Sequence, residues 1–362
     1  MKNKFNMSKI KKAVTPFNII IVLIMITVVM MIIVPLIYFV TVAFSSANEI
    51  TQFPMKMFPR FKVTVKVSYI DDDTSENYTK YRIMIKEGDS FEPAFSSRNS
   101  LEIEEYFERY LSVKKSGDDF LKDFETTKTE GAKVFTYRKN LWYNFRSFFN
   151  LTENGIQSLI NSIIVAFLTI LISVSLGSSA GYAIARYKFK GKEKVSIGLL
   201  FVRMFPVVAI SLPMAVLLIK FNFYDSLISL AIVYSIPNIA LTTWITSGIF
   251  IGINPELEDA SCIFGASKLQ TFMKITLPMA FPAIAASSMY AFSTAWNDTI
   301  TALILTNNNS TLALAVYKAI GSSTGDIQFA AAGSIILIIP ALVYTFIMRK
   351  YIGQMWGAST VK

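Results

Sequence analysis

The sequence predicts an all-α polytopic membrane protein with six transmembrane helices and a small α+β extracytoplasmic insert between helices 1 and 2. Hydrophobic residues make up 53% of the chain and charged residues 17%, and the charges are unevenly distributed. A helical span needs about 20 apolar residues to cross roughly 30 Å of hydrocarbon. Six runs meet this length, the third with one arginine: residues 17–44, 156–185, 195–219, 226–253, 277–296 and 329–348.

Lysine and arginine predict the orientation of these spans. Residues 1–16 carry five lysines and no acid, and residues 186–194 carry five cations against one acid. Both segments are therefore expected on the cytoplasmic side. With six spans, residues 254–278 and the tail 349–362 are also cytoplasmic, so both termini of this multi-pass cell-membrane protein face inward.

The first apolar run has an alternative interpretation as a signal peptide. Its 28 residues exceed the usual apolar region of such a peptide, and no small-residue cleavage site follows it. These two features favour a retained membrane anchor.

Residues 45–155 form the one large hydrophilic region, with 18 of the 25 acids and 17 of the 35 basic residues. The net charge of +10 therefore comes from the rest of the chain, where it suits anionic headgroups and gives no support to nucleic-acid binding. Residues 61–70 and 78–86 alternate around the turn-like DDDTSEN and predict a β-hairpin. Residues 100–125 are expected to be helical, and 133–137 to add a strand.

The polar segment 254–278 separates two apolar runs and carries strong helix signals. Asn254 is a predicted N-cap, Pro255 stands at the first helical position, and three acids follow near the positive helix start. Gly265 stands where a left-handed residue would end this helix. Ser267 and Gln270 have the spacing of a capping box, which predicts a second helix. The segment is therefore expected to form a helix, a glycine turn and a helix.

At these residues the chain resembles the permease subunits of binding-protein-dependent ABC importers, in the maltose-permease-like carbohydrate branch. The family signature is matched by Asp259-Ala260-Ser261, then Gly265, then Ile275, Leu277 and Pro278, with its spacing intact. Two departures are Ser261 in place of an alanine and Phe264 in place of a frequent acid. The resemblance covers residues 140–362 well and 17–52 loosely, and most of the insert has no counterpart.

The resemblance implies an ATP-driven importer of a sugar or related solute. Its partners would be a second permease subunit, a cytoplasmic ATPase dimer that binds ATP and Mg²⁺, and an extracytoplasmic solute-binding protein. The loop 307–326 would face the binding protein, and residues 357–362 would touch the ATPase. The residues implied in ATPase docking are Glu256, Glu258, Asp259, Ala260, Gly265 and Ala266.

The chain lacks the residues that catalytic and metal sites need. It has no histidine and one cysteine, Cys262, so common zinc sites and Ser-His or Cys-His nucleophiles cannot be built. No P-loop sequence occurs, so ATP is expected on another subunit. We therefore expect a transporter subunit, with no catalytic residue, metal or cofactor of its own.

Two other classes of protein remain open from the sequence. An ion-coupled secondary transporter should carry several intramembrane ionisable groups and inverted repeats, and only Arg203 is present. A receptor that senses ligand through residues 45–155 would need a cytoplasmic output domain, and the predicted cytoplasmic segments are short.

Several residues inside the predicted spans are candidates for packing or for the solute pathway. Gly177 and Gly181 belong to a stripe of small residues that packs against either a second permease or a helix of this chain. Arg203, Tyr290 and Asn297 are pathway candidates. The alternatives are a snorkelling arginine and interfacial aromatic anchors.

Overall fold

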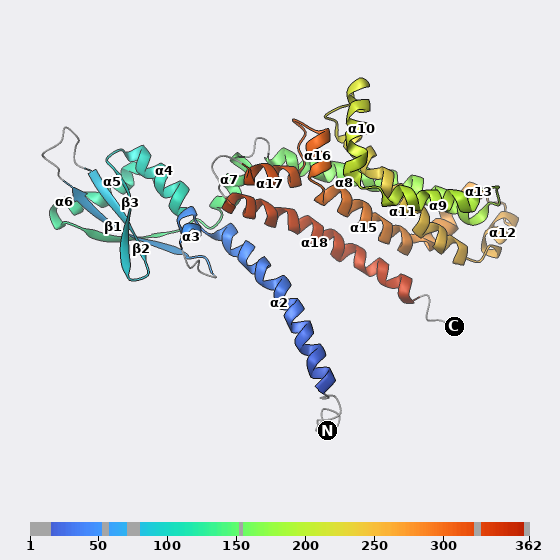
Figure 1. The fold of residues 1–362 in the computed structure, drawn as a ribbon, viewed down its shortest axis with the longest axis horizontal. Helices are drawn as coiled ribbons and strands as arrows, with labels where there is room; N and C mark the ends of the chain where they lie inside the picture. Colours follow the sequence, from blue (N-terminus) through green and yellow to red (C-terminus); the bar gives the residue numbers. More distant parts are fainter. Residues whose placement is uncertain (1–15, 53–57, 71–79, 152–154, 322–326, 358–362) are drawn as a thin grey trace. The chain divides into compact units, whose positions relative to one another are not determined.

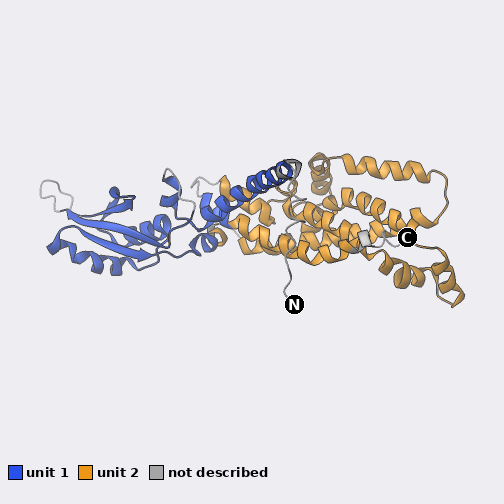
Figure 2. Cartoon of the chain, turned by 90° about the horizontal axis from the view of Figure 1, so that it is seen from below, with its two compact units in different colours: residues 1–147, 326–332 blue, residues 148–325, 333–362 orange. Residues whose placement is uncertain are grey.

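A computed structural model describes residues 16–52, 58–70, 80–151, 155–321 and 327–357 (Figure 1). The predicted basic N-terminal residues 1–15, the DDDTSEN turn and the last five residues lie outside the described residues. The described chain is mostly helical and divides into two units (Figure 2). Unit 1 holds residues 1–147 and 326–332, and unit 2 holds residues 148–325 and 333–362.

Unit 1 begins with helix α2, Pro16–Phe44, which coincides with the first predicted span. Side chains from residue 20 to residue 40 are exposed, and nearly all are apolar. Such a surface suits lipid rather than water. The short helix α3, Ala47–Thr51, follows directly.

A buried ion pair joins α3 to the segment that leaves the sheet. The Nζ of Lys139 lies 2.6 Å from Oε2 of Glu49, and the Lys139 side chain is fully buried. Asn144, in α7 (Tyr143–Leu151), donates to the carbonyls of Ala43 and Ser45 at 2.8 and 2.7 Å. Burial lowers the pKa of Lys139, and the charge of Glu49 opposes this effect. The segment that follows β4 is therefore tied to α3 and to the end of α2.

Four antiparallel strands form the sheet of unit 1, in the order β3-β2-β1-β4. Their bounds are β1 Lys62–Ile70, β2 Lys80–Glu87, β3 Ser90–Ser97 and β4 Lys133–Arg138. β1 and β2 lie on the two alternating segments, and Val65 pairs with Ile85 on β2 and Phe135 on β4. β3, which the sequence analysis missed, is an edge strand.

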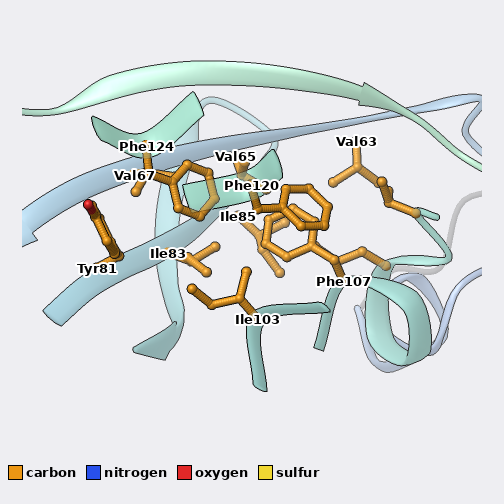
Figure 3. Close-up of a cluster of buried hydrophobic side chains, with 12 residues drawn as sticks. Val63, Val65, Val67, Tyr81, Ile83, Ile85, Ile103, Phe107, Phe120 and Phe124 are labelled. Atoms are coloured by element: carbon orange, nitrogen blue, oxygen red, sulfur yellow. The ribbon is translucent and has the colours of Figure 1, made fainter. Parts of the chain in front are cut away.

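Helices cover one face of this sheet and build its core (Figure 3). They are α4 Ser100–Leu111, α5 Gly117–Glu125 and the short α6 Thr127–Glu130. α4 buries Ile103, Phe107 and Leu111 at helical spacing, and the ring of Phe107 lies 4.2 Å from that of Phe120 on α5. These rings rest on the valines that β1 turns toward the helices, Val63, Val65 and Val67. We call residues 62–138 the sheet domain.

The described residues of unit 2 form helices joined by loops, with no strand among them. Its longer helices are α8 Gly155–Arg186, α9 Lys192–Met204, α10 Val207–Lys220, α11 Leu227–Gly252 and α15 Phe281–Asn297, and α18 Ile327–Gly357 continues into it. The shorter helices are α12 Glu256–Ile263, α13 Lys268–Thr271, the π-helix η1 Phe272–Thr276, α14 Leu277–Met279, α16 Ile300–Leu305 and α17 Leu312–Ile320. α8 and α11 form the most extensive helix pair, and α15 packs against both.

Among the residues that the structure describes, four helices are long and apolar enough to span a membrane: α2, α8, α11 and α18. Two bent pairs bring the number to six if each is one span. α9 and α10 meet at 90°, and the segment from α13 to α14 meets α15 at 76°. The third predicted span, 195–219, consists of two helices that meet at a sharp bend, because Pro206 interrupts it. A residue before proline avoids the helical region, and Phe205 is extended with φ −69° and ψ 129°.

Candidate functional site

The polar segment 254–278 joins α11 to α15, and its first helix begins as the sequence predicts. Oδ1 of Asn254 accepts the backbone N–H of Glu256 at 3.1 Å. Glu256, Glu258 and Asp259 occupy the first turn of α12, where the helix dipole favours negative charge.

Gly265 ends α12 in a left-handed conformation, with φ +89°. The N–H of Ala266 reaches the carbonyl of Ser261 at 3.1 Å, which is the long hydrogen bond of a Schellman motif. Ser267 and Gln270 then form the predicted capping box at the start of α13. The helix, glycine turn and helix are therefore confirmed. The second helix departs from regular geometry, because α13 passes into the π-helix η1 before α14.

One acid of α12, Glu258, points into the protein rather than outward. Its carboxylate accepts from Nε of Arg186 at 2.8 Å, from the Tyr182 hydroxyl at 2.8 Å and from Thr276 Oγ1 at 3.0 Å. Nη2 of Arg186 also lies 2.8 Å from Oε1, and both side chains of this ion pair are almost buried, at 13% and 12% exposed. Glu258 therefore links α12 to α8 and η1.

Burial acts to raise the pKa of the Glu258 carboxyl. The hydrogen bonds from Arg186, Tyr182 and Thr276, together with the guanidinium charge, outweigh it and hold the pKa below its usual value. Nη2 of Arg186 also donates to the carbonyl of Ile253 at 2.9 Å, just after α11 ends. A single ion pair thus fixes the ends of two long helices to α12, and we call it the Glu258–Arg186 brace.

Other contacts hold the inner face of the segment. Ser261, which replaces a signature alanine, hydrogen-bonds Thr271 through the two hydroxyls. The ring of Phe272 lies 4.6 Å from that of Tyr182 and 6.1 Å from that of Phe250. The Ser261 departure is therefore used for a contact inside the segment.

The outer face of the segment combines acidic and apolar side chains. Glu256, Asp259, Ala260 and Gly265 are exposed, and Ala266 is half-buried. Phe264 is 91% exposed and Ile263 85%, at the end of α12 beside the glycine turn. Exposed apolar side chains of this size are a feature of surfaces that contact a protein or a membrane.

The structure brings two of the three pathway candidates together. The guanidinium of Arg203, in the last turn of α9, lies 6.0 Å from the centre of the Tyr290 ring on α15. Asn297 stands two turns further along α15 and donates to Ser293 at 3.1 Å. An arginine over a tyrosine ring is a cation–π contact, so Arg203 has a partner inside this chain.

The two glycines of α8 pack against α11 of the same chain. A Cβ on Gly177 would lie 2.6 Å from Cβ of Thr242, and one on Gly181 would lie 2.2 Å from Oγ1 of Thr246. For these two positions the structure selects the within-chain alternative.

A second carboxylate contact, which sequence reasoning missed, lies at the other end of α11. Asp225 accepts the backbone N–H groups of Asn307, Asn308 and Asn309 at 2.9, 3.1 and 3.1 Å. It adopts φ +57° just before α11 begins. The contact fixes the start of the loop that follows α16.

No group of three His, Cys, Asp or Glu side chains could hold a metal ion within the part of the chain that the structure describes. Helices fit to span a membrane, with a braced helix–turn–helix between two of them, define the class of multi-pass membrane proteins.

Comparison with known proteins names the family. The model of the binding-protein-dependent transport system inner membrane component matches residues 173–355, about half of the chain. The chain is 33% identical over 202 residues to the trehalose transport system permease protein SugB of Mycobacterium tuberculosis, covering 54% of this chain and 73% of that protein. It is 29% identical over 235 residues to the trehalose/maltose transport system permease protein MalG of Thermococcus litoralis, covering 64% and 84%.

The chain therefore belongs to the family of inner membrane components of binding-protein-dependent transport systems. Its fold is similar to that of a chain in a bacterial ABC transporter that imports the polysaccharide alginate, with a TM-score of 0.59 at 16% identity. That alignment covers 97% of this chain and 99% of the other. The family match begins at residue 173, so the sheet domain lies outside it.

Proposed function

We propose that this chain is one of two membrane subunits of an ATP-driven importer of a sugar, and that segment 254–278 docks its ATPase. The family and the trehalose and maltose systems of its relatives support the class and the solute. The docking site is inferred from the difference between the two faces of this segment. Its inner face is fixed by Glu258, and its outer face leaves Phe264 exposed.

The proposed arrangement in the membrane has six spans, each bent pair counting as one. Both termini and segment 254–278 are cytoplasmic, and the sheet domain is an extracytoplasmic α+β insert. The lysine and arginine bias supports this orientation. The ion-coupled transporter and the receptor are not favoured, because the family match accounts for the whole of segment 254–278.

The proposed docking contacts are of three kinds. Glu256 and Asp259 meet basic groups of the ATPase, and Phe264 enters an apolar pocket there. Ala260, Gly265 and Ala266 let the two backbones approach closely. ATP and Mg²⁺ bind to the ATPase subunits, and a solute-binding protein delivers the sugar on the other side.

Glu258 has a different role from its two neighbouring acids in this proposal. When nucleotide-driven closure of the ATPase moves α12, the Glu258–Arg186 brace passes the displacement to α8 and to the end of α11. The solute pathway then changes its accessibility, with Arg203, Tyr290 and Asn297 as candidates along it.

The chain supplies its own probe for this proposal, because Cys262 is its single cysteine and is exposed on α12. A membrane-impermeant maleimide should label it in inside-out vesicles and not in right-side-out vesicles. Added ATPase should slow the labelling at least tenfold. As a matched control, Ser90→Cys on the sheet domain, combined with Cys262→Ser, should be labelled only from the opposite side.

Labelling of Cys262 from outside would refute the orientation. Labelling from inside that the ATPase leaves unchanged would refute docking at this segment.

A further inference from the structure

The sheet domain carries a cleft of about 510 Å³ at its edge strand. It lies between β3, the end of β2, and the helices α3 and α4, and Asn48, Glu92, Phe95, Tyr106 and Tyr110 are among its lining residues. The pairing of β2 with β3 is interrupted here, because Ile83 faces Phe95 while Met84 faces Pro93. A bulge and a proline are features of edge strands, and they leave this edge open to a ligand.

Three aromatic rings form a row along the cleft. The rings of Phe95 and Tyr106 are parallel within 3° at 4.3 Å, and those of Tyr106 and Tyr110 lie at 5.2 Å with 24° between their planes. Tyr106 and Tyr110 stand one helical turn apart on α4, beside the stripe that α4 buries. Tyr110 remains 45% exposed. Because the rings stack on one another and Phe95 and Tyr106 also pack against the core, Tyr110 is the ring of this row that keeps an exposed surface for a ligand.

The polar groups around these rings are uncommitted. Within the residues that the structure describes, the Asn48 amide, the Glu92 carboxylate and the hydroxyls of Tyr106 and Tyr110 make no hydrogen bond. Burial, with a smaller contribution from Tyr110, raises the pKa of Tyr106 to about 12. Its hydroxyl therefore keeps its proton at neutral pH and can donate a hydrogen bond. The cleft presents both donors and acceptors to a ligand.

The charge of the cleft favours a neutral ligand over a cation. The Glu87 carboxylate accepts a hydrogen bond from Gln52 at 2.8 Å, and Gln52 in turn accepts one from Arg60 at 3.1 Å. Glu87 is therefore already linked to a cation through hydrogen bonds. Glu92 is then the one uncommitted carboxylate of the described lining. A metal ion or a polyamine would require more acids than this.

We propose that this cleft binds a neutral oligosaccharide, as a second sugar site of the importer outside the membrane. A sugar ring has apolar C–H faces that pack on aromatic rings, and hydroxyls that pair with an amide, a carboxylate and phenols. This proposal rests on the proposed function for the extracytoplasmic location and for sugar as the solute. The site would hold sugar near the entrance to the pathway.

The test measures sugar binding to the full complex of both permeases and the ATPase in nanodiscs, without the binding protein. Glucose, trehalose, maltose and maltotriose are the probes, and saturation-transfer NMR reports binding. Tyr110→Ala and Glu92→Gln change exposed side chains of the cleft. Leu101→Ala and Glu105→Gln are matched controls, because both lie exposed on α4 and outside the cleft lining.

We expect at least one probe to bind the wild-type complex, and Tyr110→Ala to weaken this binding about tenfold, the effect of one well-placed contact. Glu92→Gln should weaken it severalfold, and the controls should bind as wild type does. The difference between wild type and Tyr110→Ala assigns the signal to the cleft rather than to the transmembrane pathway.

Three results would overturn the proposal. The first is that Tyr110→Ala leaves the binding of every probe unchanged, and the second is that no probe binds the wild-type complex. The third comes from a separate measurement with the solute-binding protein added: if Tyr110→Ala lowers the affinity for that protein without affecting sugar binding, the cleft is a protein contact. The Cys262 labelling experiment fails or succeeds independently of this one. It reports on segment 254–278, which is proposed to lie on the other side of the membrane from the cleft.

Discussion

The Glu258–Arg186 brace makes a prediction that separates positioning from docking. Glu258→Gln removes the carboxylate charge while it keeps the size of the side chain. The substitution leaves Arg186, whose side chain is 13% exposed, without its charged partner. A hydrogen bond to a charged group contributes about 1.5–3 kcal/mol, and breaking a fully buried pair costs about 3–5 kcal/mol. Because the pair is slightly exposed and glutamine can still accept one bond, we expect a loss of about 2–3 kcal/mol.

This free energy is the difference between the state in which the Glu258–Arg186 brace holds α12 and the state in which it does not. At about 1.4 kcal/mol per factor of ten, the braced population falls roughly 30- to 140-fold relative to the unbraced one. The depressed pKa of Glu258 means that the brace is fully present above the carboxyl's unfolded pKa and is lost as pH falls through the folded pKa. Measurements at neutral pH therefore report the intact interaction.

The assay is sugar uptake per ATP hydrolysed, in proteoliposomes that hold the complete importer and its binding protein. For Glu258→Gln we expect the ATPase to stay bound and to hydrolyse ATP, while uptake per ATP falls at least tenfold. Glu256→Gln is the matched control, because Glu256 lies two residues away on the exposed face. It should weaken ATPase binding slightly and leave uptake per bound ATPase unchanged.

Two outcomes would refute the reasoning. Normal uptake per ATP in Glu258→Gln would show that the ion pair does not transmit movement. Loss of the ATPase on purification would show that Glu258 is a docking contact after all. A double-mutant cycle with Arg186→Met adds a second criterion: the two effects should share an interaction energy of about 2 kcal/mol rather than add.

Two further predictions concern glycines with different structural reasons. Gly265→Val should abolish uptake while the protein still inserts normally into the membrane. A Cβ at this position would meet nothing within 4 Å, so the cost comes from the backbone, whose φ of +89° valine avoids. Gly265→Asn, which tolerates this conformation, should retain uptake, and equal uptake in both variants would contradict the argument. Gly181→Leu should lower the yield of folded protein by an overpacking cost of about 1–3 kcal/mol or more, since its Cβ would lie 2.2 Å from Thr246 Oγ1. Gly198→Leu, in open space, is its control, and similar thermal stability of the two variants would count against the packing.

Local signals explain why much of segment 254–278 could be predicted. The cap at Asn254, the glycine turn and the capping box depend on residues within one or two turns of each other. The orientation of Glu258 depends instead on Arg186, 72 residues earlier. No pattern along α12 distinguishes Glu258 from Glu256, so sequence reasoning placed both on the docking face.

The same distinction holds for the fold. Alternation predicted β1 and β2, whereas β3 reads SFEPAFSS, in which Pro93 interrupts the alternation of apolar side chains and a bulge shifts the pairing with β2. Length and hydropathy predicted the third span, and the 90° bend at Pro206 was missed since a hydropathy window does not weigh a single proline. The packing of Gly177 and Gly181 needed the structure to identify α11 as the neighbour.

The two carboxylate contacts define what α11 can transmit. Asp225 fixes the loop at residues 307–309 just before α11 begins, and Arg186 of the brace holds the carbonyl of Ile253 just after it ends. Between them, Gly177 lets α8 and α11 approach so closely that a Cβ would not fit. Helices in such contact cannot slide without a steric clash, so we expect α8 and α11 to move as one body. A displacement of α12 would then reach the loop at residues 307–309 through this pair, which connects the proposed ATPase side to the side where the sugar is delivered.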